Sequence, residues 1–310
     1  MGPAFVYKAD PQRGRQWAEV FRREAPEIHF RFWPEIGDAR EVRFLAAWEP
    51  PADLATRFPN LELLFSTGAG VDQFDFAALP AHLPVVRMVE PGIVQGMVEY
   101  VMHAVLDLHR DMPAYRRAQQ QGHWQALPVR TAGACRVGVL GLGSLGQAVL
   151  AQLVALGFDA AGWSRSRHDL PGVRCHAGAE ELDSFLARTQ ILVCLLPLTD
   201  ETRGLLNAAL FTKLPRGASL VHVGRGPQLI ATDLLSALDD GTLAEAALDV
   251  TDPEPLPSNH PLWLHPRVRI TPHIASMTQP QSAARVVIDN LRRHARGEPL
   301  VGLVDRSRGY

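Results

Sequence analysis

Residues Cys135 to Gly146 read CRVGVLGLGSLG, and this stretch decides the fold of the chain. An apolar run ends in the pattern Gly141-x-Gly143-x-x-Gly146, and apolar residues then recur at helical spacing. This order predicts a strand, a tight turn and a helix, the setting in which such glycines bind a dinucleotide. We expect Gly141 to allow the turn, Gly143 to let backbone approach a pyrophosphate, and Gly146 to let the helix pack on the strand. The helix N-terminus then offers free N–H groups and a positive dipole end to the phosphates.

The end of the next predicted strand, residues 159–163, indicates which dinucleotide binds. An acidic residue usually stands here to bind the ribose 2′-hydroxyl of NAD. This chain has Ser164-Arg165-Ser166-Arg167 instead. Two guanidinium groups and two hydroxyls suit a 2′-phosphate, so the sequence predicts that NADP(H) is preferred over NAD(H). A solvated basic turn is the alternative.

Length and composition limit the class of protein. A chain of 310 residues with 46% hydrophobic and 21% charged residues predicts a globular protein of about two domains. The net charge of -2 gives no reason to expect nucleic acid or an anionic membrane as partner. We find neither a membrane-spanning apolar run nor a secretory signal, so a cytoplasmic location is expected. Cys135, Cys175 and Cys194 lack CxxC spacing, and we expect buried thiols in a reducing compartment and no metal site.

Strand and helix patterns alternate twice along the chain, which favours two parallel sheets covered by helices. The strands expected in the first part are residues 5–7, 28–32, 44–48, 61–66 and 85–89. Its expected helices are residues 15–24 and 53–58, with a longer helix over 97–110 leading out. In the second part, after the glycine motif and strand 159–163, the expected strands are residues 191–196, 219–224, 246–250 and 268–270. The expected later helices are residues 207–213, 231–239 and 281–295.

Three residues that follow predicted strands have side chains suited to reducing a 2-oxo acid. They are Arg225 in HVGRG, Glu254 in DVTDPEPLP and His273 in TPHIA. Ligands of open α/β sheets bind beyond the carboxyl ends of strands, so all three are candidates for one crevice. Hydride arriving at a carbonyl carbon builds negative charge on oxygen, which needs a cation and a proton donor. Arg225 would hold the carbonyl oxygen and carboxylate, His273 would give the proton, and Glu254 would favour the imidazolium. Taken singly, each is weak evidence, because an Arg, Glu or His in a loop is more often surface decoration.

A glycine-rich loop, Ser66-Thr67-Gly68-Ala69-Gly70-Val71-Asp72, follows a predicted strand of the first part. Successive N–H groups in such a loop can form an anion-binding nest that suits a substrate carboxylate. A plain turn is the alternative.

Taken in order, these motifs resemble the NAD(P)-dependent D-2-hydroxyacid dehydrogenase family over nearly the whole chain. The motifs that carry the resemblance are GLGSLG, HVGRG, DVTDPEPLP, TPHIA and GAGVD. Further segments resemble the branch of the family that reduces glyoxylate and hydroxypyruvate, namely AWEPP, EYV, GHWQALP, GWSRSR, PLTDET, PLW-HPRV and the terminal VDRSRGY.

The resemblance implies two Rossmann- or flavodoxin-like doubly wound parallel-sheet domains with the active site in the cleft between them. Residues 1–98 with 284–310 would form the substrate domain. Residues 99–283 would form the dinucleotide-binding domain, including an arm that pairs two subunits into a homodimer.

The resemblance also implies roles for individual residues. Arg225 resembles the substrate-binding arginine, Glu254 and His273 the acid-assisted proton donor, and residues Gly68, Ala69 and Gly70 the carboxylate loop. The implied cofactor-binding set is Gly141, Gly143, Ser144, Leu145, Gly146, Ser164, Arg165, Ser166, Leu196, Pro197, Thr202, Val223, Gly224 and Asp249.

Three positions depart from the family pattern. His222 stands where asparagine is usual, Gly224 replaces a common alanine, and Thr251 replaces a phenylalanine. A more flexible Gly224 would shift Arg225 slightly.

Two tryptophans are further candidates. Trp48 ends a first-part strand and resembles a pocket-lining residue, where a bulky indole leaves room only for a short substrate. Packing in a core or at a domain seam is the alternative. Trp124 either reaches the active site of a partner subunit or packs in the core of a dimer.

The sequence therefore predicts NADPH-dependent reduction of glyoxylate and hydroxypyruvate to glycolate and D-glycerate. A reductase of larger 2-oxo acids such as phenylpyruvate and a non-catalytic nucleotide-sensing protein are the alternatives.

Overall fold

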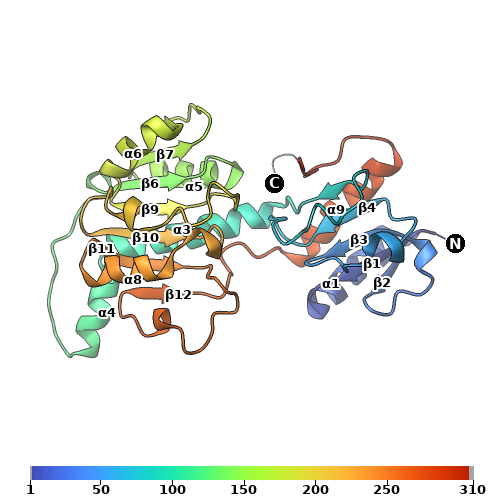
Figure 1. Cartoon of the computed structure of the whole chain (residues 1–310), viewed down its shortest axis with the longest axis horizontal. Coiled ribbons are helices and arrows are strands. Elements are labelled where there is room, and N and C mark those ends of the chain that lie inside the picture. The colour runs from blue at the N-terminus through green and yellow to red at the C-terminus, as the bar shows by residue number, and fades with distance from the viewer. Residues whose placement is uncertain (1, 307–310) are drawn as a thin grey trace. The chain divides into compact units, whose positions relative to one another are not determined.

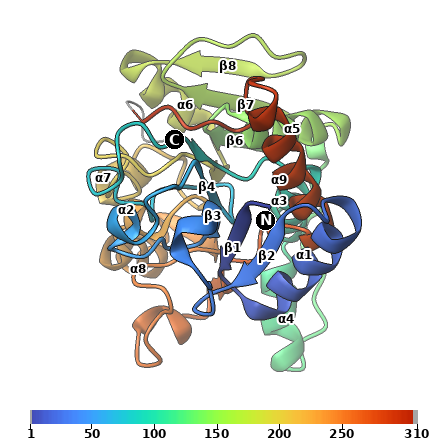
Figure 2. The ribbon, with the colours of Figure 1, turned by 90° about the vertical axis from the view of Figure 1, so that its right-hand side faces the viewer.

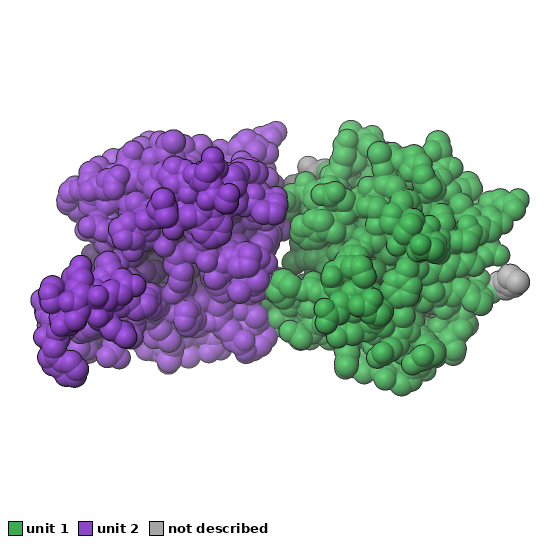
Figure 3. All heavy atoms as spheres, turned by 90° about the horizontal axis from the view of Figure 1, so that it is seen from below, with its two compact units in different colours: residues 1–93, 277–310 green, residues 94–276 purple. Residues whose placement is uncertain are grey.

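The computed structural model describes residues 2–306 and divides into two compact units (Figure 3). Unit 1 comprises residues 1–93 and 277–310, and unit 2 comprises residues 94–276. The C-terminal motif VDRSRGY extends beyond the described residues, so positions 307–310 are not considered further. The units change at residues 93 and 276, where 98 and 283 were expected. One reason is the buried carboxylate of Glu90, which accepts hydrogen bonds from Gln279 N (2.9 Å) and Ser282 Oγ (2.8 Å). These bonds hold the segment that begins at residue 277 in unit 1.

Unit 1 is a five-stranded parallel sheet of order β2-β1-β3-β4-β5. Its elements are β1 Ala4–Lys8, α1 Pro11–Glu24, β2 His29–Phe32, β3 Val42–Ala47, α2 Leu54–Arg57, β4 Leu63–Ser66, β5 Val85–Val86 and α9 Pro280–Ala295 (Figure 1). Helices α1 and α9 lie side by side on one face of the sheet (Figure 2). Aromatic rings fill this face, with Phe5 and Phe21 centroids 4.7 Å apart. Leu54 and Phe58, in and after α2, pack with strand residues on the other face.

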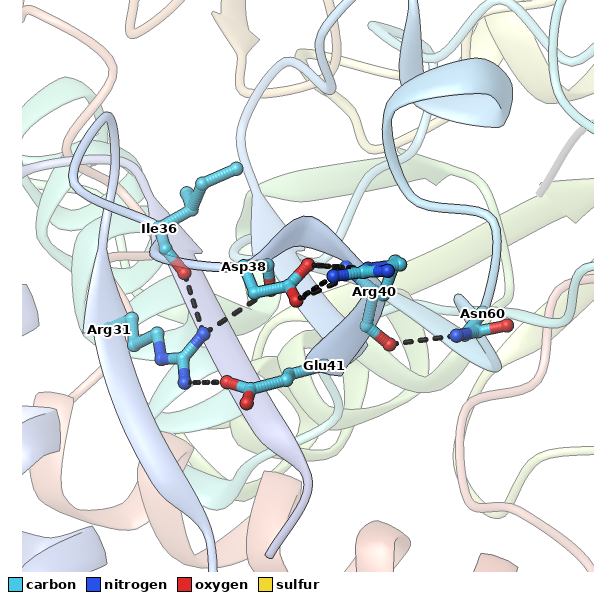
Figure 4. A network of polar contacts seen from close by, with 6 residues as sticks. All are labelled: Arg31, Ile36, Asp38, Arg40, Glu41 and Asn60. Atoms are coloured by element: carbon cyan, nitrogen blue, oxygen red, sulfur yellow. Dashed lines mark hydrogen bonds and ion pairs between the residues drawn. The ribbon is translucent and has the colours of Figure 1, made fainter. Parts of the chain in front are cut away.

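The segment that joins β2 to β3 is held by a polar network (Figure 4). The Arg31 guanidinium donates to Ile36 O (2.7 Å) and pairs with Glu41. Asp38 caps the following turn by accepting from Arg40 N (2.9 Å) and also pairs with the Arg40 side chain. These contacts hold the connection together with Trp33, Ile36 and Ala39, which pack against the core of the unit.

Unit 2 is a seven-stranded parallel sheet of order β12-β11-β10-β9-β6-β7-β8. Its elements are β6 Arg136–Leu140, α5 Ser144–Ala155, β7 Asp159–Ser164, β8 Arg174–Ala177, α6 Leu182–Arg188, β9 Ile191–Cys194, α7 Ala208–Phe211, β10 Ala218–His222, α8 Ala231–Asp239, β11 Leu243–Leu248 and β12 Val268–Ile270. Helix α3, Pro91–His109, leads into this unit and is followed by α4, Met112–Gln120. Helices α3 and α5 cover one face of the sheet, and α6, α7 and α8 cover the other. Successive residues of a strand point to opposite faces, so they belong to two separate cores.

The strands predicted from the sequence are present, although β5 ends at Val86. Helix α1 begins at Pro11 and not at residue 15, because Asp10 Oδ1 caps it by accepting from Arg13 N (2.8 Å). Helix α3 begins at Pro91 and not at residue 97. The sequence reading missed β8, α4 and α6. Among these, α4 is held by tertiary ion pairs, Arg116 to Asp107 (2.8 Å) and Arg117 to Glu245 (2.6 Å).

The expectation of buried thiols is confirmed for two of the three cysteines. Cys135 and Cys194 are buried, whereas Cys175 in β8 is partly exposed. Burial raises the pKa of Cys194 to about 12, so this thiol stays protonated. Within residues 2–306, no helix combines the length and apolarity that crossing a membrane requires.

Gly138 in β6 tests how tightly the sheet of unit 2 packs on α6. A Cβ at this position would lie 2.7 Å from Thr189 Cγ2 and 2.8 Å from Phe185 Cζ. We expect Gly138→Ala to lower the free energy of unfolding by about 1–3 kcal/mol, the usual cost of overpacking. Urea unfolding measures the change. Gly133→Ala is the matched control, because its Cβ would meet only Gly157 O at 3.6 Å. Equal stability of the two variants would contradict this account.

Candidate active site

The predicted strand, turn and helix around the three glycines are confirmed as β6, a tight turn and α5. Gly141 has φ of +105° and its Cβ would lie 2.8 Å from Leu195 O, so only glycine fits this turn. A Cβ on Gly146 would overlap the carbonyl of Gly141, which lets α5 approach the turn closely. No atom lies within 4 Å of the Cβ position of Gly143, so this side of the turn is open to a ligand.

The N-terminus of α5 has the properties of an anion site. Its N-cap is Gly143, which supplies no capping side chain. Among residues 2–306, no group accepts a hydrogen bond from the N–H of Ser144 or Leu145. A 12-residue helix with free N–H groups at its first turn suits a pyrophosphate.

The basic turn after β7 carries both predicted arginines, Arg165 and Arg167. Ser164 Oγ donates to Ser166 O (2.7 Å), and Arg165 and Ser166 are exposed. The Arg167 guanidinium pairs with Glu181, whose carboxylate also accepts from Ala177 N (2.8 Å). The charge of Arg165 acts on Glu201, whose pKa it helps to lower. Both arginines therefore remain candidates for a 2′-phosphate.

The loop after β9 contains Leu196, Pro197 and Thr202, three of the predicted cofactor residues. Thr202 Oγ1 donates to Pro197 O (2.8 Å) and accepts from Thr199 N (2.8 Å), so its hydroxyl closes the loop. The loop after β10 contains Val223, Gly224 and Arg225, and Val223 N donates to Cys194 O (3.2 Å) at the end of β9. Strand pairing of β9 with β10 thus brings both loops to one edge.

Gln228 connects these two loops, a role that the sequence analysis missed. Its side chain is fully buried. Gln228 Oε1 accepts from Arg225 N (2.8 Å), while Nε2 donates to Pro197 O (2.9 Å) and Leu196 O (3.2 Å). No sequence pattern marks a glutamine three residues after an arginine, so only the tertiary contacts reveal it.

The structure explains two of the departures from the family pattern. A Cβ on Gly224 would overlap Gln228 Oε1 and lie 3.1 Å from Leu196 O, so Gln228 leaves space only for glycine. His222 is fully buried, with Nε2 donating to Arg225 O (3.0 Å). Burial lowers the pKa of His222 to about 4, so the ring is neutral. Arg225 is thus held through both its N–H and its carbonyl, which corrects the expectation that Gly224 loosens it.

The structure brings the three predicted catalytic residues together in unit 2. His273 Nδ1 lies 2.9 Å from Glu254 Oε2, which leaves Nε2 for another partner. Burial raises the pKa of Glu254, but hydrogen bonds from His273 and Thr251 N outweigh it, and the charge of Arg225 acts in the same direction. The net pKa lies below its usual value, so a charged carboxylate lies beside the His273 ring at neutral pH.

Asp249 organises the loop that carries His273. Its buried carboxylate accepts from Thr271 Oγ1 (2.7 Å), Ile274 N (2.9 Å) and Ala275 N (2.8 Å). His273 has φ of +52°, a left-handed conformation that costs free energy in a residue with a Cβ. The hydrogen bonds to Asp249 offset this cost. The structure therefore gives Asp249 a positioning role, and its contact with a cofactor stays a prediction.

The glycine-rich loop of unit 1 follows β4 as predicted. Buried Ser66 holds it, because Ser66 Oγ donates to Gly70 O (2.8 Å) and accepts from Gly68 N (3.2 Å). Within the described part of the chain, nothing accepts a hydrogen bond from the N–H of Ala69 or Gly70. These two groups are available to an anion.

The two tryptophans differ in their surroundings. Trp48 is 42% exposed, and its Cζ3 lies 3.0 Å from the Cβ position of Gly68, so the indole borders the glycine-rich loop. Trp124 is fully exposed in the single chain.

A cavity of unit 2, of about 470 Å³, lies away from these residues. Its lining includes Cys135, Ile191, Ala218 and Leu243, which stand at the starts of strands. The glycine turn and the catalytic residues follow the ends of strands. The cavity therefore belongs to the opposite edge of the sheet.

Residues 102–275 match the family model of the D-isomer specific 2-hydroxyacid dehydrogenase, NAD binding domain. The chain is also 39% identical to glyoxylate/hydroxypyruvate reductase A of Yersinia enterocolitica over 302 residues, 96% of each protein. The chain belongs to the D-isomer specific 2-hydroxyacid dehydrogenase family and is an NAD(P)-dependent oxidoreductase.

Two solved structures are similar over the full length of both chains. One is a D-isomer specific 2-hydroxyacid dehydrogenase from Xanthobacter autotrophicus in complex with NADPH and MES, with 43% identity and a TM-score of 0.94. The other is an NADPH-dependent glyoxylate/hydroxypyruvate reductase from Sinorhizobium meliloti in complex with NADP and sulfate, with 35% identity and a TM-score of 0.93.

A double-mutant cycle tests the link between Gly224 and Gln228. We expect Gly224→Ala alone to cost about 1–3 kcal/mol of unfolding free energy and to lower kcat/KM, because Gln228 must move and release Arg225 N. In a Gln228→Ala background the added methyl has space, so the same change should cost less. Urea unfolding of the four proteins gives the coupling energy. Additive losses would show that the two side chains do not compete for this space.

Proposed function

We propose that the protein reduces glyoxylate and hydroxypyruvate to glycolate and D-glycerate with NADPH. The observation that carries the proposal is the hydrogen bond between Glu254 and His273, with Arg225 beside them, in a member of a dehydrogenase family. The similarity to glyoxylate/hydroxypyruvate reductase A supports the choice of substrates.

Unit 2 has the residues to hold a dinucleotide. Free N–H groups at Ser144 and Leu145 suit the pyrophosphate, and the open face of Gly143 lets it approach. Arg165, Ser164 and Ser166 suit a 2′-phosphate, which makes NADP(H) the proposed cofactor. When bound, NADPH supplies the hydride.

The chain's own residues would bind the substrate and move the proton. The guanidinium of Arg225 binds the carbonyl oxygen and carboxylate of the 2-oxo acid and stabilises the developing charge. His273 donates a proton to that oxygen from Nε2, while Glu254 holds Nδ1 and favours the charged ring. The N–H groups of Ala69 and Gly70 bind the substrate carboxylate, and the Trp48 indole hinders a bulky group such as phenyl beyond C2.

The proposal includes the arrangement of the chain. Unit 1 would bind the substrate and unit 2 the dinucleotide. The exposed segment around Trp124 would belong to an arm that pairs two subunits into a homodimer in the cytoplasm.

Oxidation of NADPH with glyoxylate, hydroxypyruvate and phenylpyruvate tests the reaction. We expect the two short substrates to have the higher kcat/KM. A higher value for phenylpyruvate would favour the reductase of larger 2-oxo acids, and binding of NADPH without turnover would favour a sensor.

Arg165→Ala tests the cofactor preference. We expect the Kd of NADPH to rise roughly tenfold or more. The loss of one charge-assisted contact should cost about 1.5–3 kcal/mol of binding free energy. NADH binding should change little. Arg167→Ala is measured beside it, because a 2′-phosphate that binds this guanidinium would have to share it with Glu181. Equal weakening of both cofactors by Arg165→Ala would contradict the assignment.

Variants of the pair Glu254 and His273 test proton transfer. His273→Ala should lower kcat roughly 100-fold or more while NADPH still binds. Activity that needs a protonated histidine falls as the pH rises. In Glu254→Gln this fall should occur at a lower pH, because a neutral amide no longer stabilises the imidazolium. The pH dependence of kcat/KM measures this shift. An unchanged profile in Glu254→Gln would show that the carboxylate does not assist the histidine.

A further inference from the structure

A small cavity lies at the carboxyl edge of the sheet of unit 1. Its volume is about 160 Å³, well above the roughly 10–15 Å³ that one water needs. We call it the Arg13 pocket, and its lining includes Tyr7, Asp10, Arg13, Trp17, Trp48 and Thr67.

The strand order places this pocket where ligands of such folds bind. The order β2-β1-β3-β4-β5 reverses between β1 and β3, so the loops that leave these strands diverge. Tyr7 and Asp10 lie at the end of β1, and Trp48 directly follows β3. Open sheets of this order bind ligands at this reversal, outside the carboxyl ends of the strands.

The guanidinium of Arg13 has no carboxylate partner within residues 2–306. Its contacts are weak, from Nη1 to Thr278 Oγ1 at 3.5 Å and from Nη2 to Met277 Sδ at 3.4 Å. A partly buried guanidinium on a cavity wall, with donors still to satisfy, attracts an anion.

Tyr7 provides a second donor. The residue is only 3% exposed, and its ring packs on Trp17 with centroids 5.1 Å apart. Its hydroxyl has no hydrogen-bond partner among the residues that the structure describes. Burial raises the pKa of Tyr7 to about 12, so the hydroxyl keeps its proton. Buried polar groups are rarely left unpaired, and a ligand oxygen in the pocket would accept this hydrogen bond.

The charges favour one kind of anion. Asp10 also lines the pocket, although Oδ1 is engaged in capping α1. Its negative charge disfavours a dianion such as a phosphate monoester more than a single carboxylate. The planar fork of Arg13 matches the two oxygens of a carboxylate.

We propose that the Arg13 pocket binds the terminal carboxylate of a 2-oxo dicarboxylate whose other carboxylate lies on the loop of residues 68–70. The inference rests on the proposed reductase function. Trp48 joins the two subsites, because its indole lines the pocket and lies 3.0 Å from the Cβ position of Gly68. Arg13 is then a specificity residue that admits a charged group at the end of the substrate opposite the reacting carbonyl.

Steady-state kinetics with matched substrates test the proposal. Oxaloacetate and 2-oxobutyrate both have four carbons, but only oxaloacetate has a terminal carboxylate. We expect Arg13→Met to lower the kcat/KM ratio of oxaloacetate to 2-oxobutyrate roughly tenfold or more. Tyr7→Phe should lower the ratio less. Arg15→Met, an exposed arginine of the same helix, is the control and should keep the wild-type ratio. An unchanged ratio in Arg13→Met would overturn the proposal.

Binding of malonate separates this inference from the proposed function, because malonate is a dicarboxylate without a reducible carbonyl. Titration calorimetry should show its Kd rising roughly tenfold or more in Arg13→Met, while the Kd of acetate changes little. Malonate binding that depends on Arg13, in a protein that reduces no 2-oxo acid, would support the pocket and overturn the reductase. Turnover of glyoxylate with malonate binding that is indifferent to Arg13 would support the reductase and overturn the pocket.

Discussion

Parallel strands whose order reverses beside the first strand of each unit create the candidate sites of this protein. In unit 2 the reversal lies between β6 and β9, where Gly141 turns against Leu195. In unit 1 it lies between β1 and β3, where Tyr7 and Trp48 line the Arg13 pocket. Loops that leave the sheet toward opposite faces cannot fill the space between them, so an opening forms at the carboxyl edge.

Buried polar side chains give the loops at these edges their shape. The carboxylate of Asp249 accepts three hydrogen bonds from the loop that carries His273. Gln228 joins the loop of Arg225 to the loop of Leu196 and Pro197. A loop without an apolar core needs such contacts, because buried backbone groups must find partners. We therefore regard both residues as positioning residues for the side chains that would meet the substrate.

The substitutions at positions 222 and 224 are understood only together with Gln228. Taken alone, glycine at position 224 suggests a looser backbone before Arg225. In the structure the missing methyl makes space for Gln228 Oε1, which holds Arg225 N, while His222 Nε2 holds Arg225 O. The loop therefore lacks a side chain at position 224, and hydrogen bonds from Gln228 and His222 hold Arg225 in place. Thr251 has a simpler local role, since its N–H donates to Glu254 Oε1 (2.9 Å).

The sequence alone determined the parallel α/β class, the glycine turn and the residue types of the hydrogen-bonded pair Glu254 and His273. These depend on short-range patterns, such as apolar periodicity and the φ that only glycine adopts easily. It failed for α4 and β8, which lack a strong pattern of their own, and α4 depends on ion pairs with distant residues. Only the tertiary structure decided that Arg167 is engaged by Glu181, that Gln228 is buried between two loops, and that Arg13 faces a cavity. Each of these depends on residues far apart in the chain, whose proximity follows from strand order and side-chain packing.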